Sequence, residues 1–116
     1  MLKTTTKDRV TEKVEHMCGG TGYILKEALI SPEQRGSHCN LFGRVTIPAG
    51  GEIGHHEHHG EAETYYIIEG EGIYEEDGEG VLVGPGDITY CADGHGHGLK
   101  NMGDKDLVIV AMILAN

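Results

Sequence analysis

The chain has 116 residues, including 19 Gly and 8 His, and carries 19 acidic against 9 basic side chains. A chain of this length folds as one domain and can bury one modest core. The glycines have no three-residue period and only 3 residues are Pro, which excludes collagen, while 38% hydrophobic residues exclude a disordered chain. We therefore expect a folded domain that is rich in turns.

The charge and the cysteines limit the partners and the location. The net charge is −10 and the few Lys and Arg are dispersed, so we expect neither nucleic acid nor an anionic membrane surface as a partner. The longest apolar run, Leu107–Ala115, is far shorter than the roughly 20 residues of a membrane helix, and no signal peptide pattern follows Met1. Cys18, Cys39 and Cys91 form no Cys-x-x-Cys pair, which favours reduced thiols in a soluble cytoplasmic protein.

Short strands are expected along most of the chain. Residues 1–16 are polar without periodicity and indicate an N-terminal arm, assigned to residues 1–20, in which a short edge strand is one option. Over residues 21–116 we expect a single domain, where short apolar runs alternate with clusters of Gly, Pro, Asp and Asn and no window has helical periodicity. The predicted strands are Gly22–Leu29, His38–Ile47, Ile53–His58, Glu63–Glu69, Gly72–Glu76, Gly80–Val83, Asp87–Ala92, Gly96–Lys100 and Leu107–Leu114.

One turn is predicted with a mechanism. Asp77-Gly78 lies between two strand-like runs, and a two-residue hairpin turn needs residues that accept positive φ at both positions. The acidic segment around it lacks the alternating ligand pattern of a calcium loop, so we do not expect calcium there. The sequence predicts an all-β fold.

Six of the eight histidines gather between His55 and His97. In a strand, residues i and i+2 face the same side, so His56 and His58 can point two imidazoles into the interior. Glu63 begins the next predicted strand after a turn at Gly60 and could return to the same point. Two imidazoles and one carboxylate suit a borderline first-row divalent metal, and the lack of candidate thiolates nearby disfavours a site for a soft metal.

The same residues carry a family resemblance. The stretch resembles the first cupin motif, G-x5-H-x-H-x4-E-x6-G, and residues 86–101 resemble the second, G-x5-P-x-G-x2-H-x3-N. The only departure is Ala92, where the family usually has Pro, and that position supplies no ligand. The fixed positions that match are Gly50, His56, His58, Glu63, Gly70, Gly86, Gly94, His97 and Asn101.

The resemblance implies a small single-domain cupin of the cupin 2 type, with one antiparallel β-barrel of jelly-roll topology. By position it implies that one divalent transition metal ion (Mn, Fe, Co, Ni, Cu or Zn) is held by His56, His58, Glu63 and His97; the last of these comes from the family alone. Mg and Ca prefer shells made only of oxygen and are disfavoured. Cupins commonly form homodimers, and we expect the final strand and the N-terminal arm to pair or pack across the two-fold axis.

Several other residues have two interpretations. By strand alternation His55 and His59 face away from His56 and His58, so we expect them at the rim or in solvent, and His95 in a loop. Cys91 could lie near the metal or in the core. Tyr65 and Tyr90 could place hydroxyls inside the barrel, and Lys26 and Arg44 could bind a carboxylate there, although a solvated face is the commoner place for a charged side chain.

The resemblance leaves the activity open, because one fold supports many reactions. One hypothesis is a small metal-dependent enzyme that acts on a small oxygen-rich molecule, a sugar derivative or an oxo acid, by isomerisation, lyase or dioxygenase chemistry. The alternative is a non-catalytic module that uses the metal to bind a small ligand. A weaker third is metal storage or sensing through exposed His55 and His59.

Overall fold

The computed structural model describes residues 1–116. Every predicted run contains a strand, and the optional edge strand of the arm is present as β1. The only helices are two short 3-10 turns, so no helix of the structure has the length and apolarity to cross a membrane. The elements are η1 (Thr6–Asp8), β1 (Thr11–Glu15), η2 (Met17–Gly19), β2 (Tyr23–Ala28), β3 (Cys39–Ile47), β4 (Glu52–Glu57), β5 (Glu61–Glu69), β6 (Gly72–Glu76), β7 (Glu79–Val83), β8 (Ile88–Cys91), β9 (Gly96–Asn101) and β10 (Leu107–Ala115).

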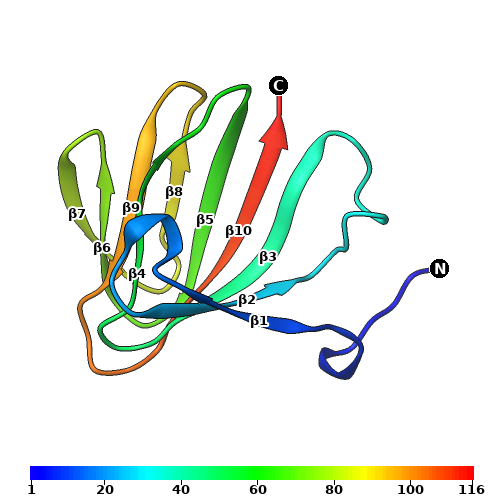
Figure 1. The fold of residues 1–116 in the computed structure, drawn as a ribbon, viewed down its shortest axis with the longest axis horizontal. Coiled ribbons are helices and arrows are strands. Elements are labelled where there is room, and N and C mark those ends of the chain that lie inside the picture. Colours follow the sequence, from blue (N-terminus) through cyan, green and yellow to red (C-terminus); the bar gives the residue numbers. More distant parts are fainter.

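The strands form two antiparallel sheets (Figure 1). One has six strands in the order β1-β2-β3-β10-β5-β8, and the other has four in the order β4-β9-β6-β7. The predicted single barrel holds only as a description of the fold type, because neither sheet closes on itself and each keeps two edge strands. The all-β, antiparallel part of the prediction is confirmed, and the architecture is that of a double-sheet jelly roll.

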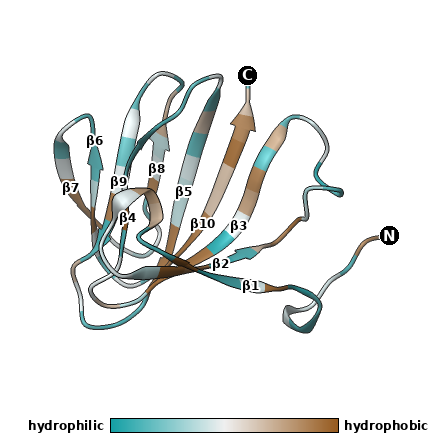
Figure 2. Ribbon diagram, viewed as in Figure 1, coloured by the Kyte–Doolittle hydropathy of each residue, from teal (hydrophilic) through white to brown (hydrophobic).

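The core lies between the two sheets and draws on both. Figure 2 shows apolar colour along most of β10, whereas β1 is largely hydrophilic. Period-2 alternation sends one set of side chains from each strand inward, and burial of this set supplies the main favourable term in folding. The buried cluster consists of Ile24, Val45, Ile47, Ile53, Tyr65, Ile67, Tyr74, Val83, Leu99, Leu107, Ile109 and Ala111.

The final strand has a different place from the one expected. β10 lies in the middle of the six-stranded sheet, hydrogen-bonded to β3 on one side and to β5 on the other. Its backbone groups are therefore satisfied within the chain, and it has no free edge with which to pair across a two-fold axis. Its long apolar run is explained by this central position, and packing of its outer face across a two-fold axis stays a prediction.

The predicted hairpin turn is confirmed at the backbone level. Asp77 and Gly78 have φ of 51° and 90°, and they join β6 to β7 as the predicted hairpin. The four glycines of the two motifs, Gly50, Gly70, Gly86 and Gly94, also have positive φ.

A break in strand alternation precedes the histidines. The register of β4 against β9 shifts between Ile53 and His56, so two residues, Gly54 and His55, occupy an irregular step. Such bulges re-aim the side chains that follow them. Gly54 also lies against η2, where a Cβ atom at this position would overlap the backbone carbonyl of Cys18 and stand 2.7 Å from the amide nitrogen of Gly20.

We expect Gly54→Ala to destabilise the protein by about 1–3 kcal/mol, because the methyl group would force η2 away from β4. The matched control is Gly84→Ala, since Gly84 has open space around its Cβ position and no positive φ. That variant should stay within about 0.5 kcal/mol of the parent. Denaturant unfolding measures both, and equal midpoints for the two variants would contradict the packing argument.

Candidate metal centre

Three separate strand segments and both sheets supply the four predicted ligands. His56 on β4 pairs directly with His97 on β9, which places the two imidazoles side by side. His58 follows the end of β4 and is fixed by backbone hydrogen bonds to residues 94 and 95 in the loop before β9. Glu63 comes from β5 in the opposite sheet, with its side chain on the inward face beside Tyr65.

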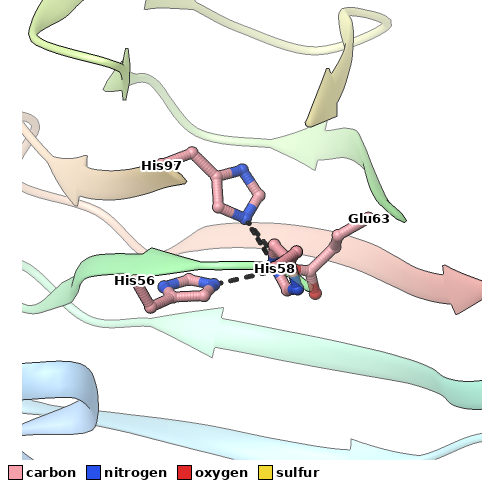
Figure 3. A group of neighbouring side chains, drawn as sticks. All are labelled: His56, His58, Glu63 and His97. Atoms are coloured by element: carbon pink, nitrogen blue, oxygen red, sulfur yellow. Dashed lines mark hydrogen bonds and ion pairs between the residues drawn. The ribbon is translucent and has the colours of Figure 1, made fainter. Parts of the chain in front are cut away.

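The four side chains point toward one another (Figure 3). One oxygen of Glu63, Oε1, lies 3.4 Å from His56 Nε2, 3.0 Å from His58 Nε2 and 2.9 Å from His97 Nε2. His58 Nε2 and His97 Nε2 are 3.1 Å apart, and one ligand atom from each of the four residues falls within 4.8 Å of the others. Three imidazole nitrogens and a carboxylate oxygen therefore meet at a single point.

The Nδ1 atom of each imidazole, which points away from the centre, lies within hydrogen-bonding distance of another group of the protein. Nδ1 of His56 lies 2.9 Å from the Gly54 carbonyl oxygen, and Nδ1 of His58 lies 2.7 Å from Glu61 Oε2. Nδ1 of His97 lies 2.9 Å from the hydroxyl of Tyr74. When Nδ1 carries the proton and donates to such an acceptor, Nε2 is left as a bare nitrogen directed at the centre.

Tyr74 and Tyr65 support His97 on two sides. The Tyr74 hydroxyl donates to Glu76 Oε1 at 2.6 Å, which leaves its oxygen to accept from the imidazole. Burial and then the Glu76 carboxylate raise the pKa of Tyr74, so the hydroxyl keeps its proton. The Tyr65 ring stacks on the His97 ring with centroids 4.8 Å apart and planes 14° from parallel. Packing and hydrogen bonding together fix this imidazole in the buried interior.

The electrostatics favour an ionised carboxylate in the centre. Burial opposes the charge on Glu63, but the hydrogen bonds from His56 and His97 and the nearby imidazoles outweigh it and lower its pKa from 4.5 to about 2. For His56, burial lowers the pKa, while hydrogen bonds to Glu63 and to the Gly54 carbonyl raise it above 6.5 overall. The centre thus attracts positive charge, whether as a proton or as a metal ion.

A cavity of about 360 Å³ opens onto this centre. His56, His58 and Glu63 line it together with Tyr65, and more than half of its lining residues are apolar. The β2 strand and the η2 turn form part of its wall. Its size is at the lower end of the range for small-molecule sites, about 300–1,000 Å³.

The donor set fits a divalent transition metal. Ligation requires neutral imidazoles and an ionised carboxylate. The lowered pKa of Glu63 favours the ionised carboxylate, and the three Nδ1 partners can hold the tautomer with a free Nε2, whereas the raised pKa of His56 means that a metal ion competes with a proton at that imidazole. Three nitrogens and one oxygen match the borderline metals from Mn to Zn better than Mg or Ca. The group could therefore hold a metal and leave further positions open toward the cavity.

The other histidines lie outside the centre, as alternation predicts. His55 and His59 are exposed, with His55 Nδ1 3.0 Å from Glu75 and His59 Nε2 3.8 Å from Glu57. His95 is also exposed, and hydrogen bonds to Asp77 raise its pKa. These three side chains form ion-pair contacts on the surface and none joins the four predicted ligands.

Some of the other candidate residues line the cavity and some do not. Cys91 is buried on β8, opposite Glu63 in the strand register, and does not line the cavity. Tyr65 lines the cavity, whereas Tyr90 is 61% exposed. Lys26 lines the cavity, whereas Arg44 is exposed on the other face of its sheet.

Sequence reasoning missed the residues behind the imidazoles, Glu61 and Tyr74 with its partner Glu76. Glu61 lies three positions after His58, and Tyr74 lies on β6 next to β9, but no spacing rule relates either residue to a particular imidazole nitrogen. The η2 turn, which brings Met17 and Cys18 to the cavity wall, also had no sequence signal.

The family profile described as Cupin domain matches residues 43–113. The chain is also 36% identical over 103 residues to the oxalate-binding protein of Thermotoga maritima, covering 89% of this chain and 85% of that protein. The chain belongs to the cupin family. The resemblance of the two sequence motifs is thereby confirmed.

Solved structures agree with the fold of this cupin. A crystal structure from Thermotoga maritima, described as a predicted oxalate decarboxylase, has a TM-score of 0.95 and 32% identity, covering 99% of this chain and 100% of that one. KdgF from Halomonas sp. has a TM-score of 0.74 with coverage of 97% and 94%, but at 18% identity this similarity concerns the fold alone.

We expect Tyr74→Phe to lower the metal affinity of this cupin about tenfold, because His97 Nδ1 loses its acceptor while the ring that packs in the core remains. Competition against a chelating dye measures the affinity. The control is Tyr90→Phe, since that residue is exposed and is not one of the hydrogen-bond partners of the three imidazoles. Equal affinities for both variants would show that Tyr74 does not orient His97.

Proposed function

We propose that this cupin binds one divalent transition metal ion through His56, His58, Glu63 and His97 and uses it to hold a small oxygen-rich carboxylate in the cavity. The observation that supports the proposal is the convergence of three Nε2 atoms on one oxygen of Glu63, with His56, His58 and Glu63 in the lining of the cavity. The proposed ion is one of Mn, Fe, Co, Ni, Cu or Zn.

Oxalate is the first ligand to test. A relative that spans most of this chain is named an oxalate-binding protein, and a small dicarboxylate belongs to the oxygen-rich molecules that suit an open metal coordination sphere. Bound there, the metal would act as a Lewis acid toward a ligand oxygen. The chain itself contributes the apolar cavity wall, which limits water around the ligand, and the Nδ1 partners, which keep the imidazoles in place.

Catalysis and simple binding remain two candidate functions. The enzyme hypothesis comprises isomerisation, lyase or dioxygenase chemistry on a sugar derivative or an oxo acid. The name of the 36% identical relative, an oxalate-binding protein, supports the binding hypothesis, whereas the description of the 32% identical structure as a predicted oxalate decarboxylase supports the lyase form of the enzyme hypothesis. Incubation of the metal-loaded protein with oxalate, oxo acids and uronates separates the two, since only an enzyme would consume a ligand or oxygen.

We expect the protein, expressed without a histidine tag, to retain about one transition metal ion per chain, as measured by elemental analysis. His97→Ala should lower the metal affinity more than tenfold, because it removes a ligand rather than an outer partner. His59→Ala is the matched control, since its imidazole is exposed and its ion-pair partner is Glu57 rather than a residue of the centre. Equal metal retention in both variants would contradict the assigned ligand set.

We also propose that the protein is a cytoplasmic homodimer. On the outer face of the six-stranded sheet, Tyr66 and Ile68 on β5 lie beside Ile88 and Tyr90 on β8, and all four are 40–61% exposed. Contiguous apolar surface of this kind is typical of protein interfaces. The three cysteines are free, as expected for a reducing compartment.

Light scattering should give a mass twice the 12.5 kDa of the chain. Replacing both Tyr66 and Tyr90 with Lys should shift that mass toward the monomer, because it places charge in the apolar patch. Replacing exposed Val81 and Leu82 on β7 with Lys gives a control in the other sheet. A monomeric parent protein would contradict the proposal.

A further inference from the structure

Lys26 is a cation inside the cavity that the metal centre does not use. On β2 the side chains of Ile24, Lys26 and Ala28 alternate onto one face, and all three line the cavity. Ile24 belongs to the buried core, so this face of β2 is the inner one. The ammonium group of Lys26 is therefore carried on a half-buried side chain rather than on a freely solvated one.

No carboxylate of the protein pairs with this ammonium group. The only ion pairs made by Lys or Arg are Arg9–Glu27 and Lys13–Glu15. Glu12 lies opposite Lys26 in the register of β1 and β2 and also lines the cavity, but it is exposed and does not come within ion-pairing distance. Lys26 therefore brings a charge without a protein counter-ion to the cavity wall, where its aliphatic stem can lie along apolar surface.

The other cation of the cavity is already engaged. Arg35 donates from Nε to the Cys39 carbonyl oxygen at 2.8 Å and from its terminal nitrogen to the Asn40 carbonyl oxygen at 2.5 Å. These bonds fasten the loop before β3 to the strand it enters. Lys26 is thus the cation of the cavity wall that is free to meet a ligand.

Lys26 stands apart from the metal centre. In the sheet, β3 and β10 lie between β2, which carries Lys26, and β5, which carries Glu63. Three strand spacings amount to about 14 Å along the sheet before its curvature is considered. Apolar side chains of the intervening strands, including Val45 and Ala111, line the cavity between the two. A ligand bound at the centre would reach Lys26 with a second group rather than with the atoms that meet the metal.

The charges of Lys26 and Glu63 both act on Cys18, a residue of the cavity wall. Cys18 lines the cavity, and burial raises the pKa of its thiol; the charge of Glu63 raises this pKa further, while the charge of Lys26 lowers it. The ammonium group and the carboxylate of the centre therefore both lie within electrostatic range of one side chain of the cavity wall.

We propose that Lys26 binds a second anionic group of the ligand, so that the cavity selects organic dianions over monoanions that bear the same metal-binding group. This inference rests on the proposed function, because the first anionic group would be held at the metal. In a chain with net charge −10, a metal ion at one end and Lys26 at the other would make the cavity a local exception that attracts dianions.

The test compares acids with their monoamides, which keep the shape and remove one charge. Isothermal titration of the metal-loaded protein with oxalate and oxamate, and with succinate and succinamate, gives a dianion preference for each length. Lys26→Met keeps the aliphatic stem and removes the charge, and Lys26→Gln is a second neutral variant. Arg44→Met is the matched control, because it removes one charge from the outer face of the neighbouring strand. Metal content is measured separately for every variant.

We expect the Lys26 variants to retain the metal, to bind the preferred diacid at least tenfold more weakly and to bind its monoamide within about twofold of the parent protein. Lys26→Arg should restore most of the preference, and Arg44→Met should leave it unchanged. Equal diacid affinities in the parent and in the Lys26 variants would overturn this inference and leave the proposed function standing. A parent protein that holds the metal but binds none of these acids would overturn both.

Discussion

The structure depends on one buried carboxylate shared by three imidazoles. Glu63 comes from the six-stranded sheet, and His56 and His97 come from the four-stranded sheet, so the contact joins the two layers at the inner end of the cavity. Charges taken out of water are tolerated only when they are paired, and removing one partner of such a group typically costs about 3–5 kcal/mol. The apolar core closes the rest of the interior. The site is therefore also a junction between the sheets, and a metal bound there would strengthen it.

The grouping of His56 and His58 could be predicted from sequence because short strands have a fixed side-chain period. His56 and His58 share a face by that rule, and the exposed positions of His55 and His59 follow from it. His97 needed the family motif, because no local rule brings a residue 39 positions after His58 to within 3.1 Å of it. That contact depends on strand pairing over a long sequence separation, which composition and periodicity do not record.

Other features were beyond prediction for identifiable physical reasons. Strand runs alone do not tell a closed barrel from two facing sheets, because both need the same alternation. The apolar run of β10 looks like an interface strand, but it is central to its sheet, with β3 and β5 on its two sides. Ile53 and His56 are three positions apart, so strict alternation would place them on opposite faces of the strand. The irregular step at Gly54 turns His56 inward, and only the backbone register reveals this step. Glu61 and Tyr74 act through hydrogen bonds, for which the sequence has no period.

The cavity wall has two origins along the chain. The four predicted ligands all lie within residues 43–113, the segment that matches the cupin profile, whereas Met17, Cys18, Ile24 and Lys26 precede it. The N-terminal segment thus contributes to the wall of the cavity in which a ligand would lie and supplies none of the four predicted metal ligands. On the proposed assignments, substitutions before residue 43 would change the part of the cavity wall around Lys26 and leave the four proposed metal ligands in place, while residues such as Val45 and Ala111 supply the rest of the wall from within the profile segment. In a family with so many activities, this division gives a physical route by which one chemistry-bearing centre acquires new ligands.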